Sequence, residues 1–347
     1  MSRPDYVFAT ATHRVTATDD PHRFRAEPGG WEFDLTRERQ TVPEALLTPA
    51  FEHAVMAWVL ARGERTLRLN GGERSLRPED LDRPPRGPVQ RLVSIAPSNA
   101  EIVWALDATD LLVGAESSSD FPPMLERLPR LGPDLAVDMD ALAALAPDLV
   151  LASLSVPGME RNIAGLERLG IPVLVLAPQN LAEIEADILR VGRTIGRSAQ
   201  ARRVTQEMAA QIAELRRKQA GHTPVPVFLE WWPKPMFTPG APCWSNEMIE
   251  LAGGVNVFRD RPQQSLEVSP EEVTQADPAV IFISWCGVPR EKLNTERVLK
   301  REGIQGVRAV REKHVVPIDE ALLGRPGPRV LEGIRRMAEA IREAEQA

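Results

Sequence analysis

The sequence has little cysteine and little lysine. Two cysteines, Cys243 and Cys286, among 347 residues exclude the disulfide framework of a small secreted protein. We interpret them as free thiols, and a single bridge between them stays open. Only five of the 42 basic residues are lysine, and the net charge of −7 is spread along the chain without a basic stripe. We therefore expect no nucleic-acid partner.

Long apolar runs are also absent. No run approaches the ~18 residues of a membrane span, so we expect a chain that is not embedded in a membrane. The first residues, MSRPDYVFATATHRV, carry an acid at Asp5 and lack the apolar core of a secretory signal. From this we expect a cytoplasmic location, with a periplasmic location as the alternative.

Signals of catalysis are missing. The sequence has no GxSxG elbow, no P-loop, no GxGxxG after a predicted strand and no paired histidines on one helix face. His13, His22 and His53 lack metal-ligand spacing, and His314 has no partner at such spacing. We therefore predict no catalytic residue and no metal site, and we expect that the protein is not an enzyme.

A proline-rich stretch, LDRPPRGP, divides the pattern of the chain near residue 85. It predicts a linker at residues 83–90 after an N-terminal α+β domain of unknown role at residues 1–82. Within that domain, WEFDL and TLRLN alternate like half-buried strands, and PEALLTPAFEHAVMAWVLARG has helical spacing that stops at Gly63.

After the linker, short apolar runs alternate with helical patterns. Runs that are apolar on both faces indicate buried parallel strands. They fall at residues 91–97, 111–116, 147–154 and 171–178, and again at 226–232, 255–260, 278–285 and 314–319. The fold class is therefore α/β: two Rossmann-like lobes, at residues 91–197 and 222–347, preceded by the small α+β domain.

A long helix at residues 198–221 connects the lobes in this prediction. Its apolar positions share one face, and about 30 Å of helix is long enough to run along both lobes as their only covalent connection. Such a clamshell leaves a cleft, and ligands of open α/β sheets bind beyond the carboxyl ends of the strands. We therefore expect the loops after the first strands to form the site.

One of these loops reads EWWPKPMFTPGAPCW and holds three of the seven tryptophans. Its prolines remove backbone donors and fix φ, which predicts a rigid loop rather than a regular strand. Flat aromatic walls suit a planar macrocycle, and rigidity lowers the ordering cost of binding. The alternative is that these aromatic side chains fill the core of the second lobe.

Several motifs, in order, resemble one family. RLVSIAPSNAEIVWAL, VGAESSSDFPP, IELAGGVNVFRD and RPGPRVLEGI are similar to the helical-backbone solute-binding proteins, which include the cobalamin-binding proteins of vitamin importers as well as haem and siderophore binders. The resemblance extends from residue 91 to the C-terminus and looks closest to a branch without a signal. It implies non-catalytic binding of a corrinoid, cobalamin or cobinamide, with no covalent cofactor. The alternative is a cytosolic sensor or interaction protein with another ligand, such as haem or a siderophore.

The resemblance also assigns residues. Phe121 stands where the family has an aromatic wall in the first lobe, and the Trp231–Pro239 loop supplies the opposite wall. The family's tryptophan before the final Pro-Arg pair is replaced here by Leu322 and Leu323. The ligand-binding candidates, weighed against core positions, are Phe121, Trp231, Trp232, Phe237, Trp244, Trp285 and Arg325, while Arg329 is more typical of a surface position.

Three further side chains, Trp104, Glu230 and Glu247, each have a structural alternative to ligand binding. Trp104 has helical spacing with Ala100 and Ile102, which predicts a core position. Glu230 and Glu247 are acceptors that could bind ligand amides, but isolated carboxylates are more often solvated.

Docking to an ABC importer is a doubtful prediction for this chain. By resemblance, one acid on each lobe meets arginines of the membrane partner. Asp140 keeps the acid of the first lobe, but Gly324 stands at the position of the second. Asp319 and Glu320 lie nearby in the sequence as alternatives.

Overall fold

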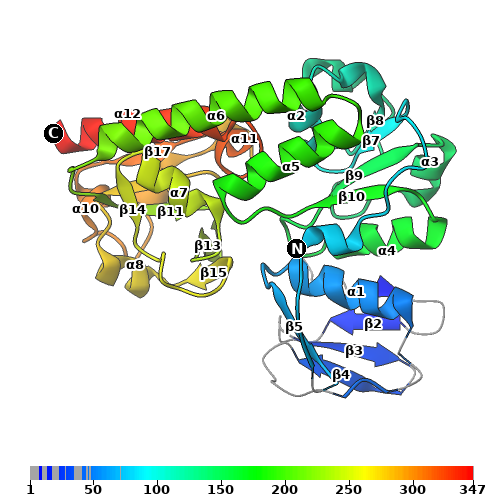
Figure 1. The fold of residues 1–347 in the computed structure, drawn as a ribbon. Coiled ribbons are helices and arrows are strands. Elements are labelled where there is room, and N and C mark those ends of the chain that lie inside the picture. Colours follow the sequence, from blue (N-terminus) through cyan, green and yellow to red (C-terminus); the bar gives the residue numbers. More distant parts are fainter. Residues whose placement is uncertain are drawn as a thin grey trace. The chain divides into compact units, whose positions relative to one another are not determined.

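The chain divides into two compact units, each built around a parallel β-sheet (Figure 1). Unit 1 comprises residues 1–177 and 194–196, and unit 2 comprises residues 178–193 and 197–347. His13 and His22 lie outside the residues that this computed structural model describes. The described residues are 8–9, 14–17, 23–27, 29–34, 41–43, 46, 48–70 and 72–346.

The first part of unit 1, its described residues up to and including Arg83, is called the N-terminal module here. An antiparallel sheet carries helix α1 (Pro49–Leu60) on one face (Figure 1). Trp58 of α1 packs edge-on against Phe24 and Phe33, with ring centroids 5.0 Å and 5.6 Å from its own. α1 begins where the Thr48 hydroxyl accepts the N–H of Phe51, with proline in the first turn. The sheet order is β1 (Phe8–Ala9), β2 (Arg14–Ala17), β3 (Arg23–Glu27) and β4 (Trp31–Asp34), and β5 (Thr66–Leu69) and β6 (Gly72–Ser75) form a hairpin before the 3₁₀ helix η2 (Pro78–Leu81).

The rest of unit 1 contains a four-stranded parallel sheet in the order β10-β9-β7-β8. All four strands are predominantly apolar on both faces, as expected for a sheet covered by helices. The strands are β7 (Leu92–Ser94), β8 (Leu112–Ala115), β9 (Leu149–Ser153) and β10 (Val173–Leu176); the helices are α2 (Pro97–Ala105), η3 (Thr109–Leu111), η4 (Pro123–Arg127), α3 (Met139–Ala144) and α4 (Glu160–Leu169).

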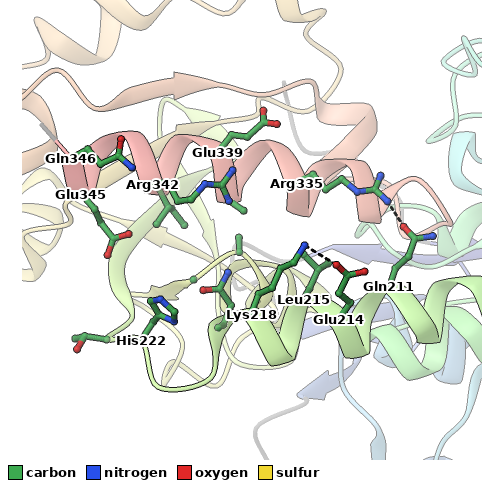
Figure 2. Close-up of a pocket in the computed structure, with 16 residues that line it drawn as sticks. Gln211, Glu214, Leu215, Lys218, His222, Arg335, Glu339, Arg342, Glu345 and Gln346 are labelled. Carbon is green, nitrogen blue, oxygen red and sulfur yellow. Dashed lines mark hydrogen bonds and ion pairs between the residues drawn. The ribbon is translucent and has the colours of Figure 1, made fainter.

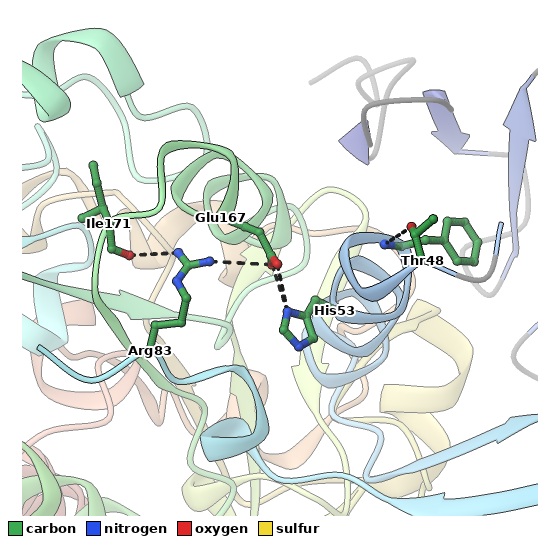
Figure 3. A network of polar contacts seen from close by, with 6 residues as sticks. Thr48, His53, Arg83, Glu167 and Ile171 are labelled. Carbon is green, nitrogen blue, oxygen red and sulfur yellow. Dashed lines mark hydrogen bonds and ion pairs between the residues drawn. The ribbon is translucent and has the colours of Figure 1, made fainter. Parts of the chain in front are cut away.

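The N-terminal module shares one hydrophobic core with this parallel sheet. Buried side chains of α1 and of the module's strands belong to the same cluster as those of β7, β9 and β10. At the junction, His53 Nδ1 lies 3.0 and 3.1 Å from the two carboxylate oxygens of Glu167 on α4 (Figure 3). This hydrogen bond is the main reason that the pKa of His53 is raised. The predicted linker begins at Arg83, which exchanges two backbone hydrogen bonds with Val173 of β10; the domain boundaries themselves remain predictions.

Unit 2 contains a parallel sheet in the order β14-β11-β16-β17 and a three-stranded antiparallel sheet, β12-β13-β15. The strands are β11 (Val225–Glu230), β12 (Trp232–Pro233), β13 (Met236–Pro239), β14 (Gly254–Asn256), β15 (Ser265–Val268), β16 (Val280–Ile283) and β17 (Val315–Pro317). The helices are α5 (Leu181–Thr194), α6 (Ser198–Gln219), α7 (Trp244–Leu251), α8 (Pro270–Ala276), η5 (Arg290–Lys292), α9 (Thr295–Leu299), α10 (Arg308–Arg311), α11 (Glu320–Leu323) and α12 (Val330–Gln346). The predicted α/β fold is thereby confirmed.

Helix α6 corresponds to the predicted long helix, with a correction to its role. Nearly all of α5 and all of α6 group with unit 2, and α6 packs against α7 and α12. The chain passes between the units after residues 177, 193 and 196. The expectation that one helix is the only connection is therefore wrong, because the sequence pattern does not show where α5 packs.

Candidate functional site

The tryptophan-rich segment of unit 2 forms a β-hairpin. Trp232 pairs with Phe237 across β12 and β13, and β13 pairs in turn with β15. The prediction of an irregular loop is therefore wrong for this part. Its prolines are tolerated because Pro233 lies on the edge strand β12 and Pro239 lies at the end of β13, where few ladder donors are needed. We call residues 231–239 the tryptophan hairpin.

Backbone hydrogen bonds hold the tryptophan hairpin to the parallel sheet. The N–H of Trp231 donates to the carbonyl of Phe237 over 2.8 Å, and the carbonyl of Trp231 accepts the N–H of Cys286 over 3.0 Å. The Trp232 indole Nε1–H donates to the carbonyl of Lys234 over 3.1 Å. The hairpin therefore presents its aromatic side chains from an ordered base.

The aromatic side chains of the hairpin differ in exposure. Trp232 is 39% exposed, whereas Trp231 and Phe237 are half-buried. A large exposed indole keeps apolar surface in water, which is unfavourable unless a partner covers it. Trp232 is therefore the strongest ligand-contact candidate of unit 2.

Trp244 and Trp285, in contrast, lie in the interior. Trp244 is 3% exposed and donates its indole N–H to the carbonyl of Leu323, while its ring lies 6.4 Å from that of Trp231. Trp285 is 4% exposed. Both satisfy their indole donors within the protein, and Trp244 also lies against Trp231 of the hairpin. A direct ligand contact by either remains a prediction.

A buried charge cluster fixes the end of β11. Glu230 is fully buried and receives the Nη2–H of Arg301 over 3.0 Å, a second, shorter bond from Arg301 Nη1, and the Trp285 indole N–H over 2.8 Å. Such a two-pronged pair compensates the desolvation of a buried carboxylate. All of these donors belong to the protein itself. The contacts of Glu230 therefore do not support the hypothesis that its carboxylate binds ligand amides. Glu247 accepts the N–H of Leu181 over 3.3 Å.

In unit 1, Phe121 lies in the segment after β8 and contacts Trp104. Their ring centroids are 4.8 Å apart in an edge-to-face arrangement. Trp104 is 45% exposed, so its predicted core position is wrong. Burial on α2 extends from Ser98 to Val103 and stops before Trp104. Trp104 is a candidate that spacing missed, since a helical period does not show where the covering layer ends.

The loop that carries Phe121 is held by polar contacts. Glu116, fully buried after β8, accepts the N–H of Ser118 and the hydroxyl of Ser119. Arg130 donates to the carbonyls of Ser117 and Ser119. Burial raises the pKa of Glu116, and the two hydrogen bonds offset part of that rise.

The predicted charged residues occupy different environments. Arg325 is 8% exposed, with its Nε 3.3 Å from a carboxylate oxygen of Glu320. That carboxylate also occupies the space beside Gly324, where an added Cβ would meet Glu320 Oε1 at 2.7 Å. Asp140 is exposed in the first turn of α3, and Arg329 is half-buried.

Cys243 and Cys286 form no disulfide bond with each other. Cys243 is buried, and burial raises the pKa of its thiol to about 11, whereas Cys286 is exposed. In the part of the chain that the structure describes, no three His, Cys, Asp or Glu side chains could together hold a metal ion. Within the same described ranges, every helix is too short or too polar to cross a membrane.

A separate cavity of about 830 Å³ lies in unit 2 between α6 and α12 (Figure 2). Its floor includes Leu215 and Ile341, and its rim mixes charges, with Lys218 Nζ 2.7 Å from Glu214. None of the predicted site residues lines it. Cationic Lys218, Arg335 and Arg342 are matched by Glu214, Glu339 and Glu345, so the rim favours no charge class of ligand.

The fold defines the class of protein: paired parallel α/β units of this kind occur in two-lobed solute-binding proteins. The family model described as periplasmic binding protein matches residues 92–322, so the chain belongs to that family. The match starts after the N-terminal module.

Individual relatives bind different ligands. The chain is 27% identical over 259 residues to the vitamin B12-binding protein of Vibrio cholerae serotype O1, covering 75% of this chain and 91% of that protein. The crystal structure of the periplasmic vitamin B12 binding protein BtuF of Vibrio cholerae is similar with a TM-score of 0.65 at 25% identity, covering 75% and 99%. The periplasmic heme-binding protein RhuT from Roseiflexus sp. RS-1 is similar with a TM-score of 0.66 at 25% identity, covering 74% and 99%.

Proposed function

We propose that the chain binds a corrinoid, cobalamin or cobinamide, and catalyses no reaction on it. The observation that carries this proposal is the exposed Trp232 indole on an ordered hairpin. A corrin is a broad, largely apolar disc with amides at its rim, and a fixed indole matches its face at a low ordering cost. The similarity to vitamin B12-binding proteins supports the same ligand class.

Trp231 and Phe237 are proposed to extend this aromatic surface, and the buried Trp244 and Trp285 are proposed to contact the ligand only if the site opens. In unit 1, the half-buried Phe121 stays a predicted contact, and the exposed Trp104 ring beside it joins the proposed contacts. Arg325 is proposed to reach the ligand only by exchanging its Glu320 partner for a ligand acceptor.

Haem is the second candidate, supported by the similarity to RhuT. Haem iron in proteins takes an axial side chain such as His, Tyr, Cys or Met. The segment 230–244 contains no histidine or tyrosine, its methionine sulfur lies 2.7 Å from Arg301 Nη1, and its Cys243 thiol is buried with a raised pKa. A corrinoid brings its own axial ligands, so this composition favours a corrinoid.

The test is direct. Purified full-length protein is mixed separately with cobalamin, cobinamide and haem, desalted, and its visible spectrum is recorded. We expect near-stoichiometric corrinoid absorbance to remain with the protein. Retention of haem alone would establish the second candidate, and retention of none of the three would refute the macrocycle proposal.

We also propose that the chain does not deliver its ligand to an ABC importer through paired surface acids. Asp140 is exposed, but the position of the second acid is Gly324, and the nearby Glu320 is paired with Arg325. A neutralised acid attracts a cationic partner less. A cytoplasmic location stays part of this proposal. Cell fractionation and corrinoid uptake in cells lacking their own corrinoid-binding protein test both; periplasmic protein, or uptake that is restored and then lost in Asp140→Ala, would contradict them.

A further inference from the structure

The N-terminal module covers the free edge of the parallel sheet in unit 1. β10 is the edge strand, paired on one side with β9. On its other side, Arg83 and Val173 exchange two backbone hydrogen bonds of 2.8 Å, and Asp82 Oδ1 accepts the N–H of Val175 over 2.8 Å. The module therefore pairs with β10 as a short additional strand would.

The module also holds both ends of β10. Arg83 Nη2–H donates to the carbonyl of Ile171 over 2.9 Å before the strand begins. Arg65, which follows α1, donates its Nη2–H to the carbonyl of Ala177 after the strand ends. Ala177 is the last residue of unit 1 before the chain first passes into unit 2. A guanidinium of the module is thus bonded to the backbone at that crossing.

Arg65 acts from a fixed body. α1 packs on α4, where His53 contacts Glu167. Arg62 Nη1 lies 3.4 Å from Glu160. The Arg62 guanidinium stacks on Trp58, 3.7 Å from the ring centroid. These contacts flank the core that the module shares with the sheet. Movement of the Ala177 carbonyl relative to this body therefore requires breaking a charge-assisted hydrogen bond.

We propose that the N-terminal module restrains the first crossing between the units through Arg65. In two-unit proteins, domain closure is absorbed by φ/ψ changes in a few residues at such crossings. The Arg65 hydrogen bond opposes these changes at Ala177. This inference concerns the chain itself and does not rest on the proposed corrinoid function.

The test is hydrogen exchange of the full-length, ligand-free protein, followed by mass spectrometry. Arg65→Ala is expected to raise the exchange rate of the peptide spanning residues 174–181 about fivefold or more, the effect of one lost hydrogen bond to a charged donor. The peptide spanning residues 50–60 in α1 should keep its exchange rate. Arg74→Ala is the matched control, because Arg74 belongs to the module and pairs with exposed Glu52.

Two outcomes would overturn the proposal. Unchanged exchange at residues 174–181 in Arg65→Ala would show that the bond restrains nothing. Faster exchange in α1 as well would show that Arg65 only stabilises the module. Arg65→Lys serves if the alanine variant does not fold: a retained charge with a shorter reach should give intermediate exchange at residues 174–181 alone, and any other pattern counts against the restraint.

Discussion

Two buried glutamates, each at the end of a strand in a parallel sheet, are stabilised by different means in the two units. Glu116 follows β8 in unit 1 and Glu230 ends β11 in unit 2, and each is fully buried beside the segment that carries its unit's aromatic candidates. Glu230 is bound by Arg301 and by an indole N–H. Among the described contacts, Glu116 has the N–H of Ser118 and the hydroxyl of Ser119 as donors, and no cation.

The two glutamates show two ways to stabilise a segment that carries ligand-binding candidates. A buried ion pair keeps its charge but fails when one partner is lost. When a buried carboxyl group has only neutral donors as partners, burial favours its protonated form and raises its pKa. Its contribution to the free energy of unfolding therefore changes with pH. Unit 2 should therefore respond most strongly to the deletion of a partner, and unit 1 to a rise in pH, which removes the contribution of Glu116.

The largest effect is expected from Arg301→Ala. Removing the guanidinium leaves the Glu230 charge buried and unpaired, which should lower the free energy of unfolding of unit 2 by about 3–5 kcal/mol. Denaturant-dependent hydrogen exchange of unit 2 peptides measures this. Arg261→Ala, which breaks an exposed pair with Glu272, is the control and should change stability by less than about 1 kcal/mol. Equal effects of the two variants would mean that the Glu230 cluster has no special role.

A smaller effect is expected for ligand binding. Trp232→Ala should weaken cobinamide binding by about 2 kcal/mol, since a central aromatic anchor contributes that much. Titration monitored by intrinsic fluorescence gives the affinity. Leu189→Ala removes another exposed apolar side chain of unit 2 and should leave the affinity unchanged. An unaltered affinity in a folded Trp232→Ala protein would remove the hairpin from the site.

Glu116→Gln should change how the free energy of unfolding depends on pH more than it changes the free energy of unfolding at any one pH. Because the pKa of Glu116 is raised in the folded protein, folding favours the protonated form. Stability from this group is full below the ordinary carboxyl pKa and falls as pH rises through the raised value. Glutamine keeps an acceptor and cannot ionise, so that fall should disappear, with a change near neutrality of about 1 kcal/mol or less. Thermal unfolding at a series of pH values is the measurement, and parallel profiles for both proteins would contradict the assignment.

The smallest effect is expected for His53→Gln. The raised pKa of His53 means that its contact with Glu167 contributes fully below the ordinary histidine pKa and is lost as pH rises through the folded value. The contact is partly exposed, so the loss should stay below about 1 kcal/mol. The same unfolding series should show a loss of stability that begins near the ordinary histidine pKa and grows as pH rises. A difference confined to the acid range would assign the effect to another group.

The sequence predicts the parallel strands well because burial on both faces leaves uninterrupted apolar runs, as in Val173–Leu176. It predicts a rigid loop around Trp232, where the structure has a β-hairpin. It could not separate Trp232 from Trp244 and Trp285, because neighbours in the sequence do not show which indole finds a buried acceptor. Trp104 was misassigned for a related reason: exposure depends on a covering layer that comes from a distant segment.

The covered edge of β10 also bears on how the chain can be shortened. The family match starts at residue 92, but a chain cut there would lose Asp82 and Arg83 and expose the backbone of an apolar strand, Val-Leu-Val-Leu. Unprotected edges of this kind pair with other chains and lead to aggregation. Evolutionary loss of the N-terminal module would therefore demand a new protecting device on β10, such as a charge pointing inward or a proline, to prevent this edge-to-edge pairing.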